Sequence, residues 1–378
     1  MAISVSSIQI NVVKLGANSD GRTDSSKAFL KAWESACSSP GLSTINVPKG
    51  RYLIGSLITF SGAQCKSSAI TFRIYGTLVA PTNYFKLSKK QNWIMFHRTN
   101  RVSIIGGTLD ARGSGLWACK NAGKGGCPTG VTSLQFSNSK NVLVSGLTSL
   151  DSQMFHIVVH ECNNVKLQGT KIRAIEDSPN TDGIHISHSS NVRVMNANIG
   201  TGDDCVSIGP GSTNLWVQNI TCGPGHGISI GSLGRFSNEP GVQNITVSTA
   251  TFTGTQNGVR IKTWAKPSTG FVKGVMFQHL KMVDVQNPVI IDQQYCNGKK
   301  NCPHMGSGIK VSDVTYQDIR GTSASKVAVT FKCNKDKPCS GIKMRGVTVK
   351  HGDSKAAVKS ECANVVGVSI AGAGCNSN

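Results

Sequence analysis

A short sequence pattern recurs four times in the middle of this chain: DGIHI at 182–186, DCVSI at 204–208, HGISI at 226–230 and NGVRI at 257–261. The first three copies are 22 residues apart, and the fourth follows 31 residues after the third. Repeats of this length with strand-like content are typical of stacked coils, in which residues one repeat apart become neighbours in space. The pattern therefore predicts that acidic residues far apart in sequence are brought to one place.

Asparagines recur with nearly the same period. Asn141, Asn164, Asn191 and Asn214 are separated by 23, 27 and 23 residues, and each precedes an apolar, strand-like segment. Asparagine is common in ordinary turns. The regular spacing instead favours a ladder of side chains that hydrogen-bond from coil to coil.

A period of about 23 residues with about three short strands predicts an all-β fold, a parallel β-helix of about ten coils. The frame of leucine-rich repeats is absent, and a sandwich would show hairpin turns without a coil period. Later coils are less regular and lie near 309–311, 342–344 and 366–368. The expected earlier strands include residues 102–105, 142–144, 165–167, 192–194 and 215–217.

One helix is expected, at residues 23–37. Thr23 or Asp24 can cap it, and Phe29, Leu30 and Trp33 fall on one face at helical spacing. We expect this helix to cover the apolar end of the coil, where an open strand edge would invite pairing. No linker or change in composition divides the chain, so a single catalytic domain over residues 1–378 is predicted, with the main coils at 101–375.

Thirteen cysteines are many for a reduced cytosolic protein. No CxxC pair occurs, which argues against zinc. The sequence does not prove connectivity, and Cys162 is left over. The candidate pairs are Cys37/Cys65, Cys119/Cys127, Cys205/Cys222, Cys296/Cys302, Cys333/Cys339 and Cys362/Cys375.

These cysteines indicate a secreted protein. No apolar run is long enough to span a membrane. The first residues lack the basic and apolar segments of a signal peptide, so we expect that the peptide has been removed. Two sequons make Asn219 and Asn244 candidate glycosylation sites.

The formal net charge of +21 predicts a polyanionic partner. The lysines are dispersed, without a basic run or alternation with aromatic residues, which disfavours nucleic acid. For a secreted protein, an acidic polysaccharide is the better expectation.

Strand periodicity orients the repeated segments. Ile184, Val206, Ile228 and Val259 form one column, and Ile186, Ile208, Ile230 and Ile261 form a second; both should point into the coil. The residues between the two columns, among them His185 and Arg260, should point outward, and so should the residues that follow the second column, among them Lys262.

Clustered carboxylates and a histidine beside these cations suggest acid–base chemistry. Mutual repulsion raises the pKa of one carboxyl, which then serves as a general acid while another serves as a base. Such a pair on this scaffold favours glycoside hydrolysis. Calcium is the rival use of clustered aspartates, and the nearby cations together with His226 argue against it. We therefore expect no metal and no cofactor.

Four motifs carry a resemblance to a known family. NTD at 180–182, GDD at 202–204, GHG at 225–227 and RIK at 260–262 resemble the signature motifs of polygalacturonases, the family 28 glycoside hydrolases, and are most similar to plant members. The resemblance implies a right-handed parallel β-helix. It also implies hydrolysis of α-1,4 bonds in homogalacturonan with inversion, in the cell wall or apoplast.

Residue roles follow from the same resemblance. It implies that Asp203 is the general acid, that Asp182 and Asp204 activate water, and that His226 supports catalysis. The implied substrate-binding residues are Arg260, Lys262, Tyr295, Asn180 and His185. A monomer is expected, and inhibitor proteins of the plant cell wall are possible partners.

Several alternatives stay open. Neighbouring coils favour a short carboxylate separation, which alone would indicate retention rather than inversion. Rival functions are a calcium-dependent pectate lyase, a hydrolase of rhamnogalacturonan or substituted galacturonan, and an inactive cell-wall binding protein. Endo action is expected over exo action, depending on whether segments 121–128 and 297–303 close one end of the cleft.

Overall fold

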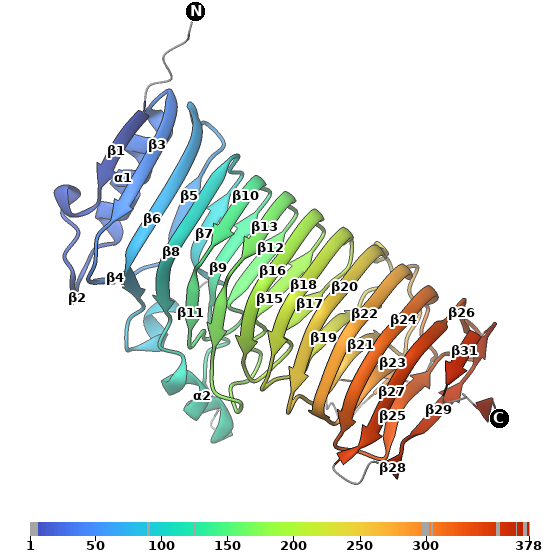
Figure 1. The fold of residues 1–378 in the computed structure, drawn as a ribbon. Coiled ribbons are helices and arrows are strands. Elements are labelled where there is room, and N and C mark those ends of the chain that lie inside the picture. Colours follow the sequence, from blue (N-terminus) through green and yellow to red (C-terminus); the bar gives the residue numbers. More distant parts are fainter. Residues whose placement is uncertain are drawn as a thin grey trace, which may run out of the picture. The chain divides into compact units, whose positions relative to one another are not determined.

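The computed structural model describes residues 7–88, 91–123, 125–296, 302–303, 305–352, 356–367, 369–372 and 376–377. Contacts divide the chain into two compact units, residues 1–184 and 185–378. Strands dominate each unit and, apart from the antiparallel pair of β27 (Lys343–His351) and β28 (Ala356–Ala357), pair in parallel, in line with the predicted parallel β-helix (Figure 1). The prediction of one catalytic domain over the whole chain stays a prediction.

Parallel ladders run through the first unit. One runs β1–β3–β6–β8–β10–β13, a second shares β6 and β8 with it and runs β2–β4–β6–β8–β11–β14, and a third runs β5–β7–β9–β12. The strands are β1 (Ser7–Asn11), β2 (Asp20–Asp24), β3 (Gly41–Val47), β4 (Arg51–Leu53), β5 (Ile58–Ser61), β6 (Ser67–Val79), β7 (Asn92–His97), β8 (Val102–Asp110), β9 (Thr132–Ser137), β10 (Lys140–Ser145), β11 (Thr148–Leu150), β12 (Ile157–His160), β13 (Asn163–Gln168) and β14 (Lys171–Arg173). Two short 3-10 helices are η1 (Val13–Leu15) and η2 (Tyr84–Leu87).

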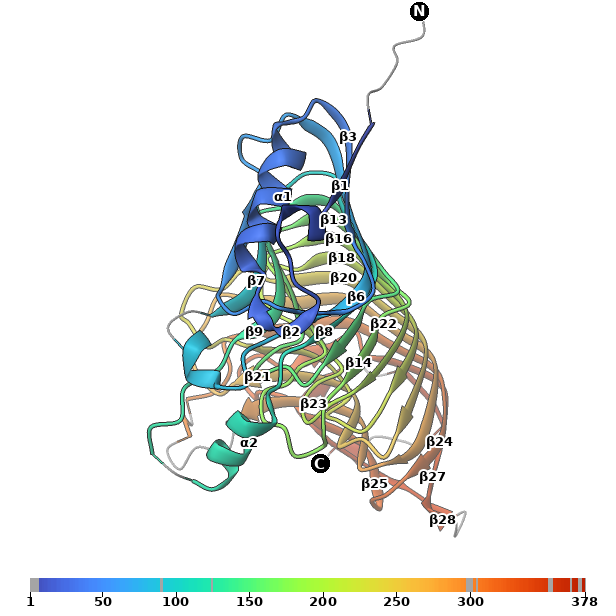
Figure 2. The same ribbon diagram turned by 90° about the vertical axis from the view of Figure 1, so that its left-hand side faces the viewer.

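Helix α1 (Ser26–Ser38) covers one end of these ladders, as predicted (Figure 2). Its Trp33 ring lies 5.3 Å from Phe60 and 5.8 Å from Phe96, so the helix joins an aromatic core. The predicted start at residue 23 was wrong, because residues 20–24 extend as β2 and the helix begins at Ser26. Asp24 does accept a hydrogen bond from the Ser26 N–H (2.9 Å), which satisfies one exposed donor of the first turn.

A second helix, α2 (Ser114–Asn121), contradicts the expectation that only strands follow residue 38. It lies in the connection between β8 and β9, where the coil period is interrupted. Leu116 and Trp117 are buried, and Cys119 forms a disulfide with Cys127. The helix is therefore anchored at both its apolar face and its end.

The second unit repeats the arrangement, with ladders β17–β19–β21–β23–β25–β29 and β16–β18–β20–β22–β24–β27. β15 (Ile184–Ser187) begins at the last residue of the first unit. The other strands are β16 (Ser190–Gly200), β17 (Val206–Ile208), β18 (Thr213–Cys222), β19 (Ile228–Leu233), β20 (Val242–Thr253), β21 (Asn257–Trp264), β22 (Phe271–Val285), β23 (Asn287–Tyr295), β24 (Lys310–Ser323), β25 (Val327–Lys332), β26 (Cys339–Ser340), β27 (Lys343–His351), β28 (Ala356–Ala357), β29 (Lys359–Ala363), β30 (Val365–Val366), β31 (Ser369–Gly372) and β32 (Asn376–Ser377).

The predicted apolar columns are buried. Val206 pairs with Ile228, which pairs with Val259, and all three are fully buried. Ile208, Ile230 and Ile261 in the second column are also fully buried, like Ile184 and Ile186. The expected strands near residues 309 and 342 are present as β24 and β27, while residue 368 lies outside the described residues.

The asparagine ladder is present in both units. In the first, Asn164 donates to Asn141 (2.7 Å), which donates to Asn100 (2.8 Å). In the second, Asn244 donates to Asn214 (3.1 Å), and Asn214 to Asn191 (3.5 Å). Asn141, Asn164, Asn191, Asn214 and Asn244 have φ near 55°, a left-handed conformation that asparagine tolerates better than most residues.

Five of the six expected disulfides are confirmed: Cys37–Cys65, Cys119–Cys127, Cys205–Cys222, Cys296–Cys302 and Cys333–Cys339. Cys362 is disulfide-bonded, and Cys375 lies outside the described residues. Cys162 keeps a buried thiol that contacts the Ser139 N–H and the His160 carbonyl. Burial raises the pKa of this thiol to about 11, so Cys162 is an unreactive core residue.

No helix within the described ranges is long and apolar enough to cross a membrane.

Candidate active site

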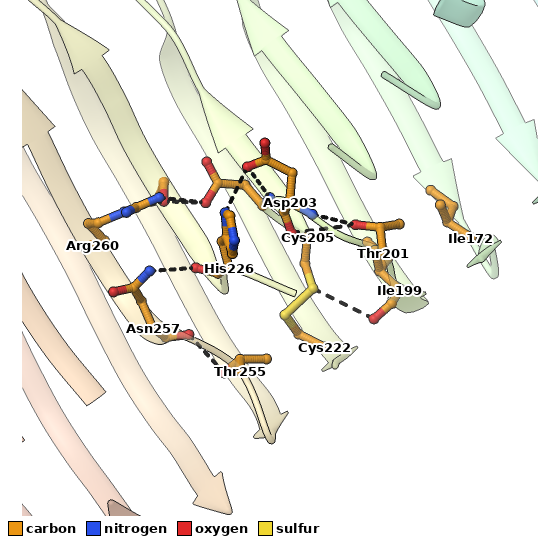
Figure 3. Close-up of a disulfide and its surroundings, with 12 residues drawn as sticks. Ile172, Ile199, Thr201, Asp203, Cys205, Cys222, His226, Thr255, Asn257 and Arg260 are labelled. Carbon is orange, nitrogen blue, oxygen red and sulfur yellow. Dashed lines mark hydrogen bonds and ion pairs between the residues drawn. A yellow bond between two sulfur atoms is a disulfide. The ribbon is translucent and has the colours of Figure 1, made fainter. Parts of the chain in front are cut away.

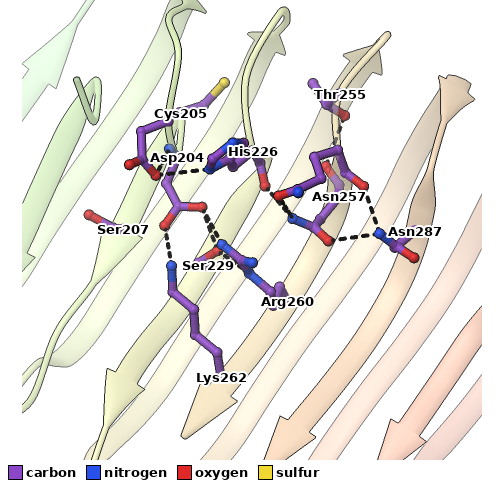
Figure 4. A network of polar contacts seen from close by, with 12 residues as sticks. Asp204, Cys205, Ser207, His226, Ser229, Thr255, Asn257, Arg260, Lys262 and Asn287 are labelled. Atoms are coloured by element: carbon purple, nitrogen blue, oxygen red, sulfur yellow. Dashed lines mark hydrogen bonds and ion pairs between the residues drawn. The ribbon is translucent and has the colours of Figure 1, made fainter. Parts of the chain in front are cut away.

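Three neighbouring strands of the second unit bring the predicted charged residues together. Asp203 and Asp204 lie in the turn before β17, His226 precedes β19, and Arg260 and Lys262 lie on β21. Strands β17, β19 and β21 pair in register, so these side chains meet although up to 59 positions separate them (Figure 4). The predicted convergence is observed for these five residues.

Asp204 is the buried centre of this group, with only 1% of its side chain exposed. Its Oδ2 accepts a hydrogen bond from Lys262 Nζ (2.8 Å). Its Oδ1 accepts from Arg260 Nη2 (3.0 Å) and from the Ser229 hydroxyl (2.7 Å) (Figure 4). Both carboxylate oxygens are therefore satisfied by cationic or hydroxyl donors.

Opposing effects set the pKa of Asp204. Burial acts to raise it, but the charges of Lys262 and Arg260, with the hydrogen bonds from Lys262 and Ser229, outweigh burial and hold the pKa below its usual value. Asp204 therefore stays ionised to lower pH than an ordinary aspartate does.

Arg260 and Lys262 were expected to bind substrate, but both also form ion pairs within the protein, with Asp204. Their side chains are 11% and 8% exposed, and each has already engaged Asp204. Arg260 Nε also donates to the Ser229 hydroxyl (3.0 Å). Because guanidinium has five N–H donors and ammonium has three, each cation retains donors beyond those given to these partners.

Asp203 stands in a different environment. Its side chain is 18% exposed, and its Oδ1 accepts from the Asp204 N–H (2.8 Å) and lies 3.1 Å from His226 Nδ1 (Figure 3). The His226 side chain is 37% exposed. Adjacent carboxyl groups thus differ in access to solvent and in charge compensation.

The disulfide Cys205–Cys222 lies directly behind the Asp203–Asp204 turn (Figure 3). The His226 N–H donates to the Asp203 carbonyl (2.8 Å), and the Cys205 N–H donates to the Gly227 carbonyl (2.7 Å). Covalent and backbone contacts therefore fix both turns, as a site that depends on carboxylate placement requires.

Tyr295, at the end of β23, closes one side of the cationic pair. Its ring lies 5.3 Å from Lys262 Nζ and 6.0 Å from Arg260 Cζ, and packs edge-on against Trp264 at 5.5 Å. Burial raises the pKa of Tyr295, so it is a neutral phenol. Sequence reasoning missed Trp264 and Ser229, although Trp264 follows Lys262 at the strand period of two.

The remaining predicted residues are less central to these contacts. His185 on β15 lies 2.8 Å from the Ser207 hydroxyl through its Nδ1. In the first unit, Asp182 is 6% exposed and its carbonyl accepts from the His156 N–H (2.8 Å). Asn180 is exposed in a turn with φ of 56°.

Residues 37–375 match the family described as Glycosyl hydrolases family 28. The chain belongs to this family. It is 53% identical to a polygalacturonase of Prunus persica over 362 residues, which cover 96% of this chain and 91% of that protein. An exopolygalacturonase of Platanus acerifolia is 44% identical, with 94% of this chain and 93% of the relative covered.

A solved structure supports the fold of this family 28 chain. The endo-xylogalacturonan hydrolase of Aspergillus tubingensis superposes with a TM-score of 0.85 at 24% identity, covering 97% of this chain and 100% of that structure. Together with the parallel ladders of both units, this likeness confirms the expected right-handed parallel β-helix.

Ligand atoms of Asp203, Asp204 and His226 lie within 4.8 Å of one another, so this family 28 site has a group with metal-like spacing. However, Asp204 already has its charge balanced by Lys262 and Arg260. A calcium ion would compete with these two cations for the same oxygens. The protein donors therefore favour acid–base use of the cluster.

Ser229→Ala should lower kcat/KM about tenfold in this family 28 protein. The hydroxyl joins Asp204 to Arg260, and loss of one buried hydrogen-bond partner costs about 1–3 kcal/mol. Its bond also lowers the pKa of Asp204, so the acidic limb of the pH–rate profile should move to higher pH. Kinetic assays across pH measure both effects.

Ser212→Ala is the matched control, because Ser212 is also fully buried and donates to the Ile186 carbonyl (3.3 Å) without touching the charged group. It should lower thermal stability without moving the pH profile. An unchanged profile in Ser229→Ala would show that Ser229 only packs.

Proposed function

We propose that this protein hydrolyses α-1,4-galacturonosyl bonds in homogalacturonan. The observation that carries the proposal is the contrast between two adjacent carboxyl groups. Asp204 is held as an anion by Lys262 and Arg260, whereas Asp203 is partly exposed beside His226. Hydrolysis of a glycosidic bond needs one carboxyl that gives a proton and one that takes it. The polygalacturonase names of the relatives support the choice of substrate.

In the proposed mechanism, Asp203 protonates the glycosidic oxygen as the bond to the anomeric carbon breaks. Asp204 and Asp182 activate the attacking water, and one of these two carboxylates takes its proton. His226, 3.1 Å from Asp203, orients that carboxyl and supplies a hydrogen-bonding or cationic neighbour as the acid loses its proton. The proton on the acid is then replaced from solvent, to which Asp203 has access.

Inversion is proposed in spite of a short carboxylate separation. One oxygen of Asp203 and one of Asp204 lie within 4.8 Å, whereas inverting enzymes usually hold their carboxyls roughly 6.5–9.5 Å apart. A retaining mechanism needs a nucleophilic oxygen, but both Asp204 oxygens accept hydrogen bonds from strong donors. These bonds weaken Asp204 as a nucleophile and favour its action on water.

Substrate carboxylates are proposed to bind the remaining donors of Arg260 and Lys262 beside the Tyr295 ring. Guanidinium and ammonium groups recognise carboxylates strongly when they are partly removed from solvent. Tyr295 offers a neutral hydroxyl and an apolar face for a sugar ring. His185 and Asn180 are proposed as further contacts along the chain of sugars.

Secretion to the plant cell wall is proposed from the disulfides and the family, since such bonds persist in oxidising compartments. Glycosylation at Asn219 and Asn244, both exposed, agrees with that route. A monomer, inhibitor proteins as partners and endo action stay predictions. Residues 297–301, in the segment 297–303 that was expected to shape the cleft end, lie outside the described residues.

Product analysis on long polygalacturonate tests the proposal. We expect new reducing ends without ultraviolet absorbance, a first-formed anomer of inverted configuration by proton NMR, and mixed oligomers from endo action. Monomer from the start would mean exo action. Absorbance that rises only with calcium would mean a lyase, and release from rhamnogalacturonan alone would assign another substrate. Binding without any product would identify an inactive wall-binding protein.

A further inference from the structure

The outer face of three neighbouring strands in the second unit carries an excess of positive charge. Strands β22, β24 and β27 pair in order within one ladder (Figure 1). The acidic residues of these strands that are not buried are fewer than the cations: Asp284, Asp313 and Asp318. Seven exposed cations form what we call the basic face: Lys273, Lys281, Lys310, Arg320, Lys343, Arg345 and Lys350.

The positive charge of the basic face does not stabilise the pairing of its strands. Lys281 lies directly opposite Arg320 in the β22–β24 register, and like charges in that relation destabilise a sheet. Asp318 contacts Arg320 and lies 2.9 Å from His279, which relieves only part of the repulsion. An external anion would relieve the rest.

The basic face also presents hydrogen-bonding amides. Gln278, Gln317 and Arg345 occupy one row across the three strands, and Gln278 donates to Ser248 (3.4 Å) on the next strand. Amides both donate and accept, which suits sugar hydroxyls. Beside this row, an open hollow is lined by His279, Leu280, Lys281, Asp318, Arg320 and Gly321.

We propose that the basic face is a second binding surface for an acidic polysaccharide, and its identification with galacturonan rests on the proposed function. The face belongs to a different ladder from β17, β19 and β21, which carry the catalytic candidates. A chain held on it leaves the catalytic carboxyls accessible to another stretch of polymer. Its role is to raise the local concentration of polymer, as two linked binding sites do.

Carbohydrate fits better than nucleic acid here. Among the described phenylalanine, tyrosine and tryptophan residues of these three strands, only Phe271 exposes its ring, at 37%. Single-stranded nucleic acid binds through a series of aromatic platforms, and the face has no such series. Regularly repeated carboxylates and hydroxyls match its cations and amides instead.

The test uses Asp203→Asn protein, so that binding is measured without cleavage. In that background, the triple variant Lys281→Gln, Lys343→Gln and Arg345→Gln should bind insoluble polygalacturonate about tenfold more weakly at low salt, because it removes three of the seven cations of the basic face. The difference should disappear at high salt. A matched control replaces Lys14, Lys27 and Lys31 of the first unit, all exposed, with glutamine.

With Asp203 intact, the triple variant should raise KM for polymer while cleaving short oligogalacturonates like the parent protein. Unchanged polymer binding, or equal weakening by the control, overturns the proposal. So does a parallel loss of binding to DNA or to anionic lipid vesicles, which would make the surface a general polyanion site. Failure of the parent to cleave polygalacturonate would instead contradict the proposed function, because binding is measured separately.

Discussion

Asp203→Asn is expected to reduce kcat on polygalacturonate about a thousandfold while leaving the fold intact. A positioned general acid contributes about 10²–10⁴ to the rate, and an amide cannot give up a proton to the glycosidic oxygen. The amide oxygen can still accept the Asp204 N–H, which now binds Asp203 Oδ1 at 2.8 Å. The turn should therefore keep its geometry while losing its acid.

Initial rates and the melting temperature test this prediction together. Asp284→Asn is the matched control. It makes the same change from carboxylate to amide at an exposed position on β22, outside the strands that carry the site. It should leave kcat unaltered. A large fall in the melting temperature of Asp203→Asn would make Asp203 structural, and near-normal kcat would remove it from catalysis.

The coil and its direction were predictable because one period controls both. The repeated pattern aligned Val206 with Ile228, 22 residues later, and with Val259, 31 residues further on, and strand alternation then turned Ser229 and Arg260 outward. The registers agree. The asparagine ladder was equally predictable from the sequence, because a left-handed turn recurs from coil to coil and favours asparagine at a regular spacing.

Burial of the site was not predictable in the same way. Periodicity gives the direction of Lys262 but not what covers it, and its neighbours leave the side chain 8% exposed. Nor does it reveal that Lys262 and Arg260 bind Asp204, because that depends on side-chain reach across two strands. Helix α2 was missed for a related reason: it lies in a connection where the repeat is interrupted and only local propensity remains.

Lys262→Met should nearly abolish activity and destabilise the protein by about 3 kcal/mol. The substitution keeps the apolar stem but removes the ammonium 2.8 Å from Asp204 Oδ2, leaving a buried carboxylate with Arg260 and Ser229 alone. Truncation of one partner of a buried charge pair typically costs about 2–5 kcal/mol. Activity falls because Asp204 is then already protonated at a higher pH than in the parent, and a protonated carboxyl cannot accept the proton of the attacking water.

The pH dependence of stability gives the sign of this effect. In the folded parent protein the pKa of Asp204 lies below that of an unfolded aspartate. The stability that ionised Asp204 contributes is therefore fully present above the unfolded pKa and is lost as pH falls through the folded pKa. Removing Lys262 raises the folded pKa. The melting temperature of Lys262→Met should therefore begin to fall at a higher pH than that of the parent during acidification.

A double substitution separates lost charge pairing from lost packing. Asp204→Asn in the Lys262→Met background removes the carboxylate that lacks its partner, so the double variant should be more stable than Lys262→Met alone. Lys273→Met, at an exposed position, should change neither activity on short oligomers nor the pH profile of stability. If the second substitution adds its own full cost to the first, the two side chains are not coupled and Asp204 does not depend on Lys262 for its charge.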